Sequence, residues 1–213
     1  VLADGEVLRC GGKNIKDVTG YNLVDLFIGS EGTLGIITEL TVKLIPKPAA
    51  TRTAKAVFPR MDDASAAVNR ILLSGVLPSK LEIMDGTTIE CVEDYLHCGL
   101  PTDAEAILII ETDGDAVNAQ REIETAAQVC KDSGASEVQV ARDAKEADEL
   151  WLARRSVSGS LGRARPNKLG EDISVPRSAI PEMVRRIKEI AFRHELRIVV
   201  FGHAGDGNLH PNI

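Results

Sequence analysis

The segment Ala106-Ile107-Leu108-Ile109-Ile110-Glu111 is followed, after a short turn, by the long run from Asp115 to Ser133. The first segment is aliphatic and short, which predicts a buried strand. The second has the length and periodicity of an amphipathic helix, and Asp115 occupies the position expected of an N-cap. This strand–helix unit indicates the fold class, because the same alternation continues on both sides of it.

Strands and helices are predicted in alternation before and after this unit. The repeated strand–helix–strand order predicts an α+β fold, in which helices cover one face of an antiparallel, ferredoxin-like sheet. The further strands are expected at 54–58, 80–84, 137–141, 171–175 and 197–201, and the further helices at 61–74, 87–95, 144–161 and 180–194.

The first part of the chain has a different character. Residues 1–9 predict a hairpin around the Asp4-Gly5 turn, and residues 36–45 alternate apolar and polar side chains as a strand does. Pro46-Lys47-Pro48 ends that strand, since proline cannot continue a ladder. We therefore expect two domains, residues 1–48 and residues 49–213.

Composition narrows the function classes. The chain of 213 residues is 44% hydrophobic and only 3% aromatic, so its core is expected to be aliphatic. The net charge of −7 argues against nucleic acid or an anionic membrane as the main partner. No apolar run approaches the roughly 20 residues of a membrane span, and we expect a soluble, cytoplasmic protein with reduced thiols, although a Cys91–Cys98 link stays open. The chain lacks an initiator Met and stops inside an expected strand, so we expect it to be part of a longer protein.

The strongest functional signal is a pair of histidines beside an Asp-Gly turn. If Asp206 and Gly207 are the central residues of a two-residue turn, His203 faces His210 across the hairpin. Two imidazoles held in this way can share a divalent cation, and Asn212 lies on the same face. Two alternatives stay open: a solvated loop without metal, and a metal-dependent hydrolase that would use Asp206 as a third ligand.

Two weaker signals precede this hairpin. Glycines at 29, 32 and 35 permit unusual dihedral angles and a close approach of backbone to a ligand, although a plain tight turn explains them as well. Arg154 and Ser158 are four residues apart on a predicted helix, as a carboxylate-binding pair requires. The alternative is an exposed arginine on an amphipathic helix. Lys168 lies close to two acidic residues, Glu171 and Asp172.

Taken together, these motifs resemble one family. Thr19-Gly20-Tyr21-Asn22-Leu23 and the run from Gly29 to Thr38 resemble the end of the PCMH-type FAD-binding domain of the vanillyl-alcohol-oxidase superfamily. Residues 51–213 resemble the substrate, or cap, domain of its D-2-hydroxyacid dehydrogenase branch. That branch includes the glycolate oxidase flavin subunit, D-lactate dehydrogenases and D-2-hydroxyglutarate dehydrogenase.

The resemblance implies a reaction and assigns residues to it. The reaction is oxidation of a D-2-hydroxy acid to the 2-oxo acid, with hydride passing to flavin N5. The resemblance places the general-base histidine and a third, glutamate metal ligand downstream, so residues 1–213 alone are expected to be inactive. It assigns FAD contacts to Gly32, Thr33, Gly35 and Ile36, zinc or a similar ion to His203 and His210, and substrate contacts to Arg154, Ser158, Lys168 and Asn212.

The resemblance also implies partners. An electron-acceptor protein or a quinone would reoxidise the flavin, a homodimer is possible by analogy, and the acceptor could bring the protein to the inner membrane. A non-catalytic, ferredoxin-like module that binds a small acid is the competing interpretation. It accounts for the α+β pattern, but not for the glycine-rich run or the paired histidines.

Overall fold

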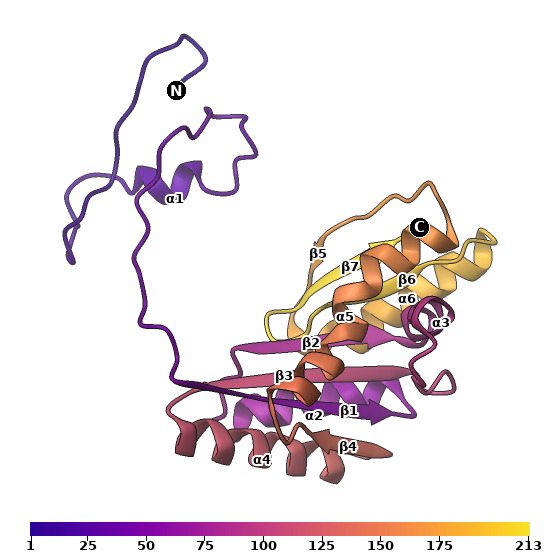
Figure 1. Ribbon diagram of the computed structural model, residues 1–213. Coiled ribbons are helices and arrows are strands. Elements are labelled where there is room, and N and C mark those ends of the chain that lie inside the picture. The colour runs from indigo at the N-terminus through magenta and orange to yellow at the C-terminus, as the bar shows by residue number, and fades with distance from the viewer. The chain divides into compact units, whose positions relative to one another are not determined.

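The structure, a computed structural model, describes residues 1–213 as two compact units, Val1–Lys47 and Pro48–Ile213. The division falls inside the Pro46-Lys47-Pro48 segment. Figure 1 shows the elements of both units.

The Val1–Lys47 unit contains one short helix, α1 (Leu23–Phe27), which sequence periodicity did not predict. The Asp4-Gly5 turn forms, with the Leu2 N–H donating to the Glu6 carbonyl at 2.9 Å. The strands predicted within 1–9 and 36–45 were wrong, because neither segment joins a ladder. Alternating side chains produce an extended chain, but a strand also needs a neighbouring backbone, and here only Val1 exchanges hydrogen bonds with Ile36 (2.8 and 2.9 Å).

The Pro48–Ile213 unit is built on one antiparallel sheet, and its order confirms the predicted α+β class. The strands are arranged β4-β1-β3-β2-β6-β7-β5. The first four, with α2 and α4, form the βαββαβ arrangement of ferredoxin-like folds, and β6, β7 and β5 extend it beyond β2. The bounds are β1 Ala50–Phe58, β2 Lys80–Asp85, β3 Ala106–Gly114, β4 Glu137–Val140, β5 Ile173–Ser174, β6 Val199–His203 and β7 Asn208–Asn212.

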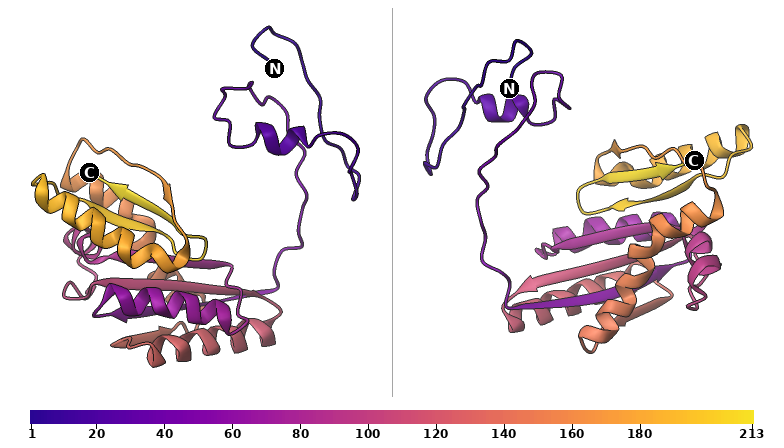
Figure 2. Two further views of the ribbon diagram at one scale, coloured as in Figure 1. Left: turned by 180° about the vertical axis from the view of Figure 1, so that it is seen from behind. Right: turned by 45° about the horizontal axis from the view of Figure 1, so that its top comes forward.

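Helices cover both faces of this sheet, so the expectation of one covered face was wrong. Figure 1 shows α5 crossing the sheet on one side, and the view from behind in Figure 2 shows α2, α4 and α6 on the other. The reason lies in strands such as β3, where Leu108 and Ile110 pack into one core and Ile107 and Ile109 into a second. The helix bounds are α2 Met61–Leu73, α3 Gly86–Leu96, α4 Ala116–Asp132, α5 Ala144–Ala164 and α6 Ile180–Arg193, with a 3-10 turn at Arg177–Ala179.

Side-chain caps fix where these helices begin. Asp115 accepts hydrogen bonds from the backbone N–H groups of Val117 and Asn118 (3.0 and 3.1 Å), which confirms the predicted cap of α4. Asp85 caps α3, accepting from the N–H and hydroxyl of Thr88 (2.9 and 2.6 Å) and also from the Val200 N–H (3.1 Å). Asp85 thereby ties α3 and β6 to the end of β2. Burial raises the pKa of its carboxyl.

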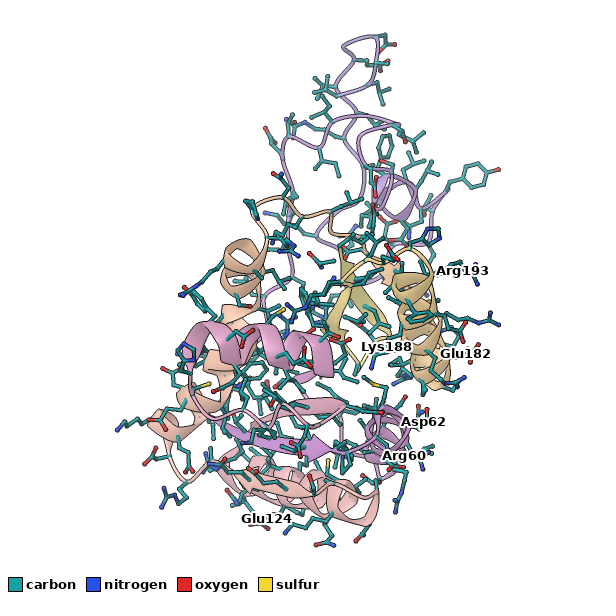
Figure 3. The ribbon with its side chains drawn as sticks, turned by 90° about the vertical axis from the view of Figure 1, so that its right-hand side faces the viewer. Arg60, Asp62, Glu124, Glu182, Lys188 and Arg193 are labelled. Carbon is teal, nitrogen blue, oxygen red and sulfur yellow. The ribbon has the colours of Figure 1, made fainter.

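The outer sides of the helices are charged, as Figure 3 shows for Glu124 on α4 and for Glu182 and Arg193 on α6. None of the helices combines the length and apolar character needed to cross a bilayer. All four cysteines are free thiols, so Cys91 and Cys98 are not linked. Burial raises the pKa of the Cys130 thiol to about 12.

Candidate active site on the β2–β6–β7 face

The β6–β7 hairpin has a different register from the one predicted. Phe201 lies opposite His210, and His203 lies opposite Asn208. Residues 204–207 form a four-residue loop instead of a two-residue turn, and the N–H groups of Asp206 and Gly207 both donate to the His203 carbonyl (3.3 and 3.0 Å). The prediction was wrong because Gly207, with a φ of +82°, closes a longer loop rather than forming the second central residue of a tight turn.

The two histidines nevertheless meet. They are diagonal neighbours on one face of the sheet, where side chains of neighbouring strands remain within reach of each other. Their ring centroids are 5.0 Å apart in an edge-to-face arrangement. Phe201 lies beside them, with its centroid 5.4 Å from that of His210. The predicted pairing of His203 with His210 in space is therefore present, although they do not face each other directly.

A carboxylate holds each imidazole at Nδ1. Glu82 lies opposite His203 across the β2–β6 pair, and its Oε1 is 2.5 Å from His203 Nδ1. Asp172, just before β5, hydrogen-bonds to His210 Nδ1. A carboxylate acceptor favours the tautomer with the proton on Nδ1 and leaves the Nε2 lone pair free. Metal-binding histidines are oriented by carboxylates in this way.

His203 and His210 are the two candidate metal ligands on this face of the sheet. No group of three or more His, Cys, Asp or Glu side chains is arranged to hold a metal ion. Asp206 is not part of such a group, and its Oδ1 accepts from the Asn208 N–H at 3.0 Å within the loop. The metal-dependent hydrolase alternative therefore lacks its third ligand. The donors present, two oriented imidazoles, fit a divalent cation such as zinc as a partial ligand set.

Arg154 on α5 reaches the same place from the helix layer. Its Nε donates to Glu82 Oε2 at 2.8 Å, and its guanidinium lies over the Phe201 ring, 4.8 Å from the centroid. The side chain is 17% exposed, and its two terminal nitrogens have no hydrogen-bond partner within the chain. A planar guanidinium held in this way presents a fork that matches a carboxylate.

A pocket of about 500 Å³ opens beside Arg154, between α5 and the strands β1, β2 and β3. Trp151 forms part of its wall and donates from Nε1 to the Thr53 hydroxyl at 3.3 Å. Lys80 lies 5.0 Å from the Trp151 ring centroid and forms an ion pair with Glu111 at 2.7 Å. The charged side chains that line the pocket are thus already paired, and the terminal nitrogens of Arg154 are among the hydrogen-bond donors that stay available.

The remaining predicted substrate residues form a second group. Lys168 Nζ donates to the Ser158 hydroxyl at 3.0 Å. Lys168 and Asn212 line a smaller pocket together with Arg197, and Asn212 Nδ2 donates to the His210 carbonyl at 3.1 Å. None of these three predicted residues lines the pocket beside Arg154. In particular, Ser158 contacts Lys168 and makes no hydrogen bond with Arg154.

The predicted cofactor residues lie in the Val1–Lys47 unit. Gly32 has a φ of +80° and open space where a side chain would be, so a ligand could approach its backbone closely. Gly35 lacks a side chain for a different reason, because a Cβ there would lie 2.9 Å from the Val1 carbonyl oxygen. Thr33 bonds from both its N–H and its hydroxyl to the Ser30 carbonyl (3.0 and 2.6 Å). Contact with FAD by these residues and Ile36 stays a prediction.

Sequence reasoning missed Glu82, which joins the two halves of the site. The available signal was an acidic residue inside the otherwise apolar core of β2, Leu81 to Met84. A charged side chain that is only 7% exposed needs partners. The sequence did not identify these partners, because His203 lies 121 residues further along the chain.

With this geometry established, comparison with known proteins identifies the family. Residues 47–213 match the family described as "FAD linked oxidases, C-terminal domain". The chain belongs to this family. The glycolate oxidase subunit GlcD of Bacillus subtilis is 47% identical over 211 residues, covering 99% of this chain and 45% of that protein. The D-lactate dehydrogenase of Archaeoglobus fulgidus is 33% identical over 215 residues, covering 100% of this chain and 46% of that protein.

Solved structures of other proteins share the fold of this member of the FAD-linked oxidase family. An alkyldihydroxyacetonephosphate synthase matches 93% of the chain and 43% of its own length, with a TM-score of 0.66 and 19% identity. The 4-ethylphenol oxidase of Gulosibacter chungangensis matches 100% and 49%, with a TM-score of 0.65 and 19% identity. The chain spans less than half the length of these relatives and neighbours.

Proposed function

We propose that this chain forms the substrate-binding part of an FAD-linked dehydrogenase that oxidises a D-2-hydroxy acid to the 2-oxo acid. One observation supports the proposal above all. Arg154, anchored through Nε, reaches the sheet face that carries two imidazoles, and each imidazole is anchored through Nδ1. An anion-binding fork next to two free imidazole nitrogens suits a molecule whose carboxylate and hydroxyl lie on adjacent carbons. The names of the relatives, glycolate oxidase and D-lactate dehydrogenase, support the same substrate class.

The residues of this chain would bind and orient the acid. The terminal nitrogens of Arg154 would accept the carboxylate as a fork and so determine which face of the substrate carbon is presented. His203 and His210 would direct Nε2 toward the hydroxyl region, where a divalent cation held by them would act as a Lewis acid. Lys168, Ser158 and Asn212 would provide a second polar contact region for the substrate.

FAD, when bound, would supply the redox chemistry by accepting the hydride. We assign its contacts in this chain to the backbone around Gly32, with Thr33, Gly35 and Ile36. The reduced flavin would then pass its electrons to an acceptor protein or a quinone. Glycolate, D-lactate and D-2-hydroxyglutarate are the candidate substrates, and all three share the carboxylate and the adjacent hydroxyl on which the proposal rests.

The test is anaerobic reduction of the flavin in the full-length gene product. Each of the three acids is added in turn, and bleaching of the visible flavin absorbance is followed. We expect one acid to bleach the flavin, and we expect Arg154→Lys to raise the KM for that acid by about 10- to 100-fold, since an ammonium retains the charge but not the fork. Arg163→Lys on the same helix, where Arg163 lies over Tyr95, is the matched control and should leave KM unchanged.

Two results would contradict the proposal. One is a full-length protein that neither retains FAD nor takes it up, which would favour the non-catalytic acid-binding module. The other is a flavin that is bleached equally well in wild type and Arg154→Lys. That outcome would place the carboxylate-binding residue elsewhere.

A further inference from the structure

We propose that Glu82 is a positioning residue that orients Arg154 and His203 together, so that the carboxylate-binding fork and the neighbouring imidazole form one rigid unit. This inference rests on the proposed function and deepens it. Its first observation is that both carboxylate oxygens of Glu82 are in use. Oε1 lies 2.5 Å from His203 Nδ1, and Oε2 accepts from Arg154 Nε at 2.8 Å.

The strand position of Glu82 makes this contact rigid. Glu82 lies in a central strand, opposite Ile109 of β3 on one side and His203 of β6 on the other. The backbone at this position is thus hydrogen-bonded into two ladders. Its side chain is 9% exposed, so few other orientations are open to it. A group held on a central strand defines the position of its partners more accurately than a group on a loop does.

Burial makes the two partners necessary. An ionised carboxylate removed from water is strongly unfavourable unless its oxygens are hydrogen-bonded and its charge is balanced. Arg154 supplies the balancing charge, and His203 supplies the second hydrogen bond. Because each partner compensates for part of the same desolvation, a displacement of one changes the environment of the other.

The choice of atoms indicates positioning rather than simple attachment of α5 to the sheet. Glu82 contacts Arg154 at Nε, which leaves both terminal nitrogens without partners. It contacts His203 at Nδ1, which leaves Nε2 without a partner. The guanidinium plane of Arg154 is also restrained by the Phe201 ring, whose centroid lies 4.8 Å from the guanidinium carbon. In both partners the nitrogen used for anchoring differs from the nitrogens that stay available for a ligand.

The Asp172–His210 pair offers an internal contrast. Asp172 also contacts an imidazole Nδ1, but its side chain is 72% exposed and it holds no arginine. Glu82 should therefore affect both metal affinity and substrate affinity, whereas Asp172 should affect metal affinity alone and less strongly. If Glu82 and Asp172 differ in this way, Glu82 positions both partners. Equal effects would indicate only that any carboxylate near the hairpin matters.

The test compares Glu82→Gln with Glu137→Gln in the full-length gene product. The two partners use different oxygens of Glu82, and glutamine replaces one of these oxygens with an NH2 group that only donates, so one of the two hydrogen bonds is lost. We expect the affinity for Zn²⁺ alone, measured by competition with a chromophoric chelator, to fall about 10- to 100-fold. We expect the KM for the acid that bleaches the flavin to rise about 10-fold or more, by more than kcat falls.

A third measurement depends on neither metal nor turnover. In zinc-free protein, the Nδ1 proton of His203, assigned by comparison with His203→Gln, should move upfield in Glu82→Gln because its acceptor has lost its charge. Glu137 is the matched control, since it is an acidic strand residue paired with Lys55 at 3.0 Å on the same sheet. Glu137→Gln should leave all three measurements unchanged.

The proposal is overturned if folded Glu82→Gln keeps the wild-type zinc affinity, KM and His203 signal and loses only thermal stability. If Glu82→Gln does not fold, Glu82→Asp replaces it, because it keeps the charge but is too short to reach both partners. Unchanged values in that variant overturn the proposal equally. If none of the acids bleaches the flavin, the proposed function fails, while the His203 proton signal still decides the role of Glu82.

Discussion

The two faces of the Pro48–Ile213 sheet bury different kinds of side chain. The face under α2, α4 and α6 has an aliphatic core that includes Leu108, Ile110 and Leu81. The opposite face is also apolar under α3 and α5, where Ile107 and Ile109 lie. Toward β6 and β7, however, this second face carries a glutamate and two histidines, and an arginine of α5 reaches them. At β2 and β6, the aliphatic core and the candidate site thus lie on opposite faces of the same sheet.

The contrast is present within single strands. In β2, Leu81 and Ile83 belong to the aliphatic core, while Glu82 belongs to the site. Successive side chains of a strand point to opposite faces, so a slip of one residue would place Glu82 in the core and Ile83 in the site. The hydrophobic face therefore fixes the register on which the polar face depends.

The largest expected effect is on the aliphatic face. Leu108 is fully buried there, and Leu108→Ala should lower the free energy of unfolding by about 2–5 kcal/mol, because it removes apolar contacts and leaves a cavity. Urea denaturation measures the loss. Zinc affinity of the folded variant should stay at the wild-type value. A loss of zinc affinity as large as that expected for Glu82→Gln would show that the two faces are not separate.

A smaller effect is expected at Asp85, which joins β2, α3 and β6. Asp85→Ala should cost about 2 kcal/mol, because it removes a helix cap and leaves buried donors without an acceptor. The native pKa of Asp85 is raised by burial, so its stabilising contribution is complete below its ordinary value of 3.8 and decreases as pH rises through the native pKa. Denaturation at several pH values should therefore show a larger loss in acid than at neutral pH.

Asp115→Ala is the control for that pH trend. Hydrogen bonds from the backbone and side chain of Asn118 lower the pKa of the exposed Asp115 carboxyl. Its contribution is therefore present above 3.8 and is lost as pH falls. The two caps should show opposite trends, and parallel trends would contradict the role of burial at Asp85.

The smallest effect is expected at Glu146, near the start of α5. The Arg142 N–H, the Arg142 guanidinium and the Gln139 amide lower its pKa to about 2. The stability it contributes should be present above its ordinary value of 4.5 and be lost as pH falls toward 2. Comparison of wild type with Glu146→Gln by thermal unfolding should show a difference that is constant at neutral pH and shrinks in acid. A difference that does not depend on pH would exclude the ionised carboxylate as its source.

Local patterns predicted most of the fold. The aliphatic run 106–111 became β3, and the cap at Asp115 began α4, because both depend on residues close together in sequence. The alternation in residues 36–45 failed as a predictor, since it describes side chains and not the backbone neighbour that a strand requires. The second helix layer was missed because a strand buried on both faces gives no alternating pattern, as in Ile107 to Ile110.

The site was predicted only in part, for a related reason. His203, His210 and Arg154 were identified by residue type and by resemblance. The structure joins His203 and Arg154 through Glu82 and places His210 beside His203. Glu82 itself could not be connected to them, because its partners lie on β6 and α5 and no local spacing links them. The hairpin register was missed because Asp206-Gly207 fits a two-residue turn and also the end of a four-residue loop.

The junction between β2 and β6 also has a consequence for the order of folding. All pairings of the β4-β1-β3-β2 part lie within residues 50–140, whereas Glu82 meets His203 across 121 residues. Contacts of such long sequence separation form slowly, because the chain entropy of a long loop must be lost before the contacts stabilise the fold. We expect a ribosome-bound chain to complete its ferredoxin-like part first, with β2 as a temporary open edge that can pair with other chains. Pairing of β6 with β2 would then close this edge.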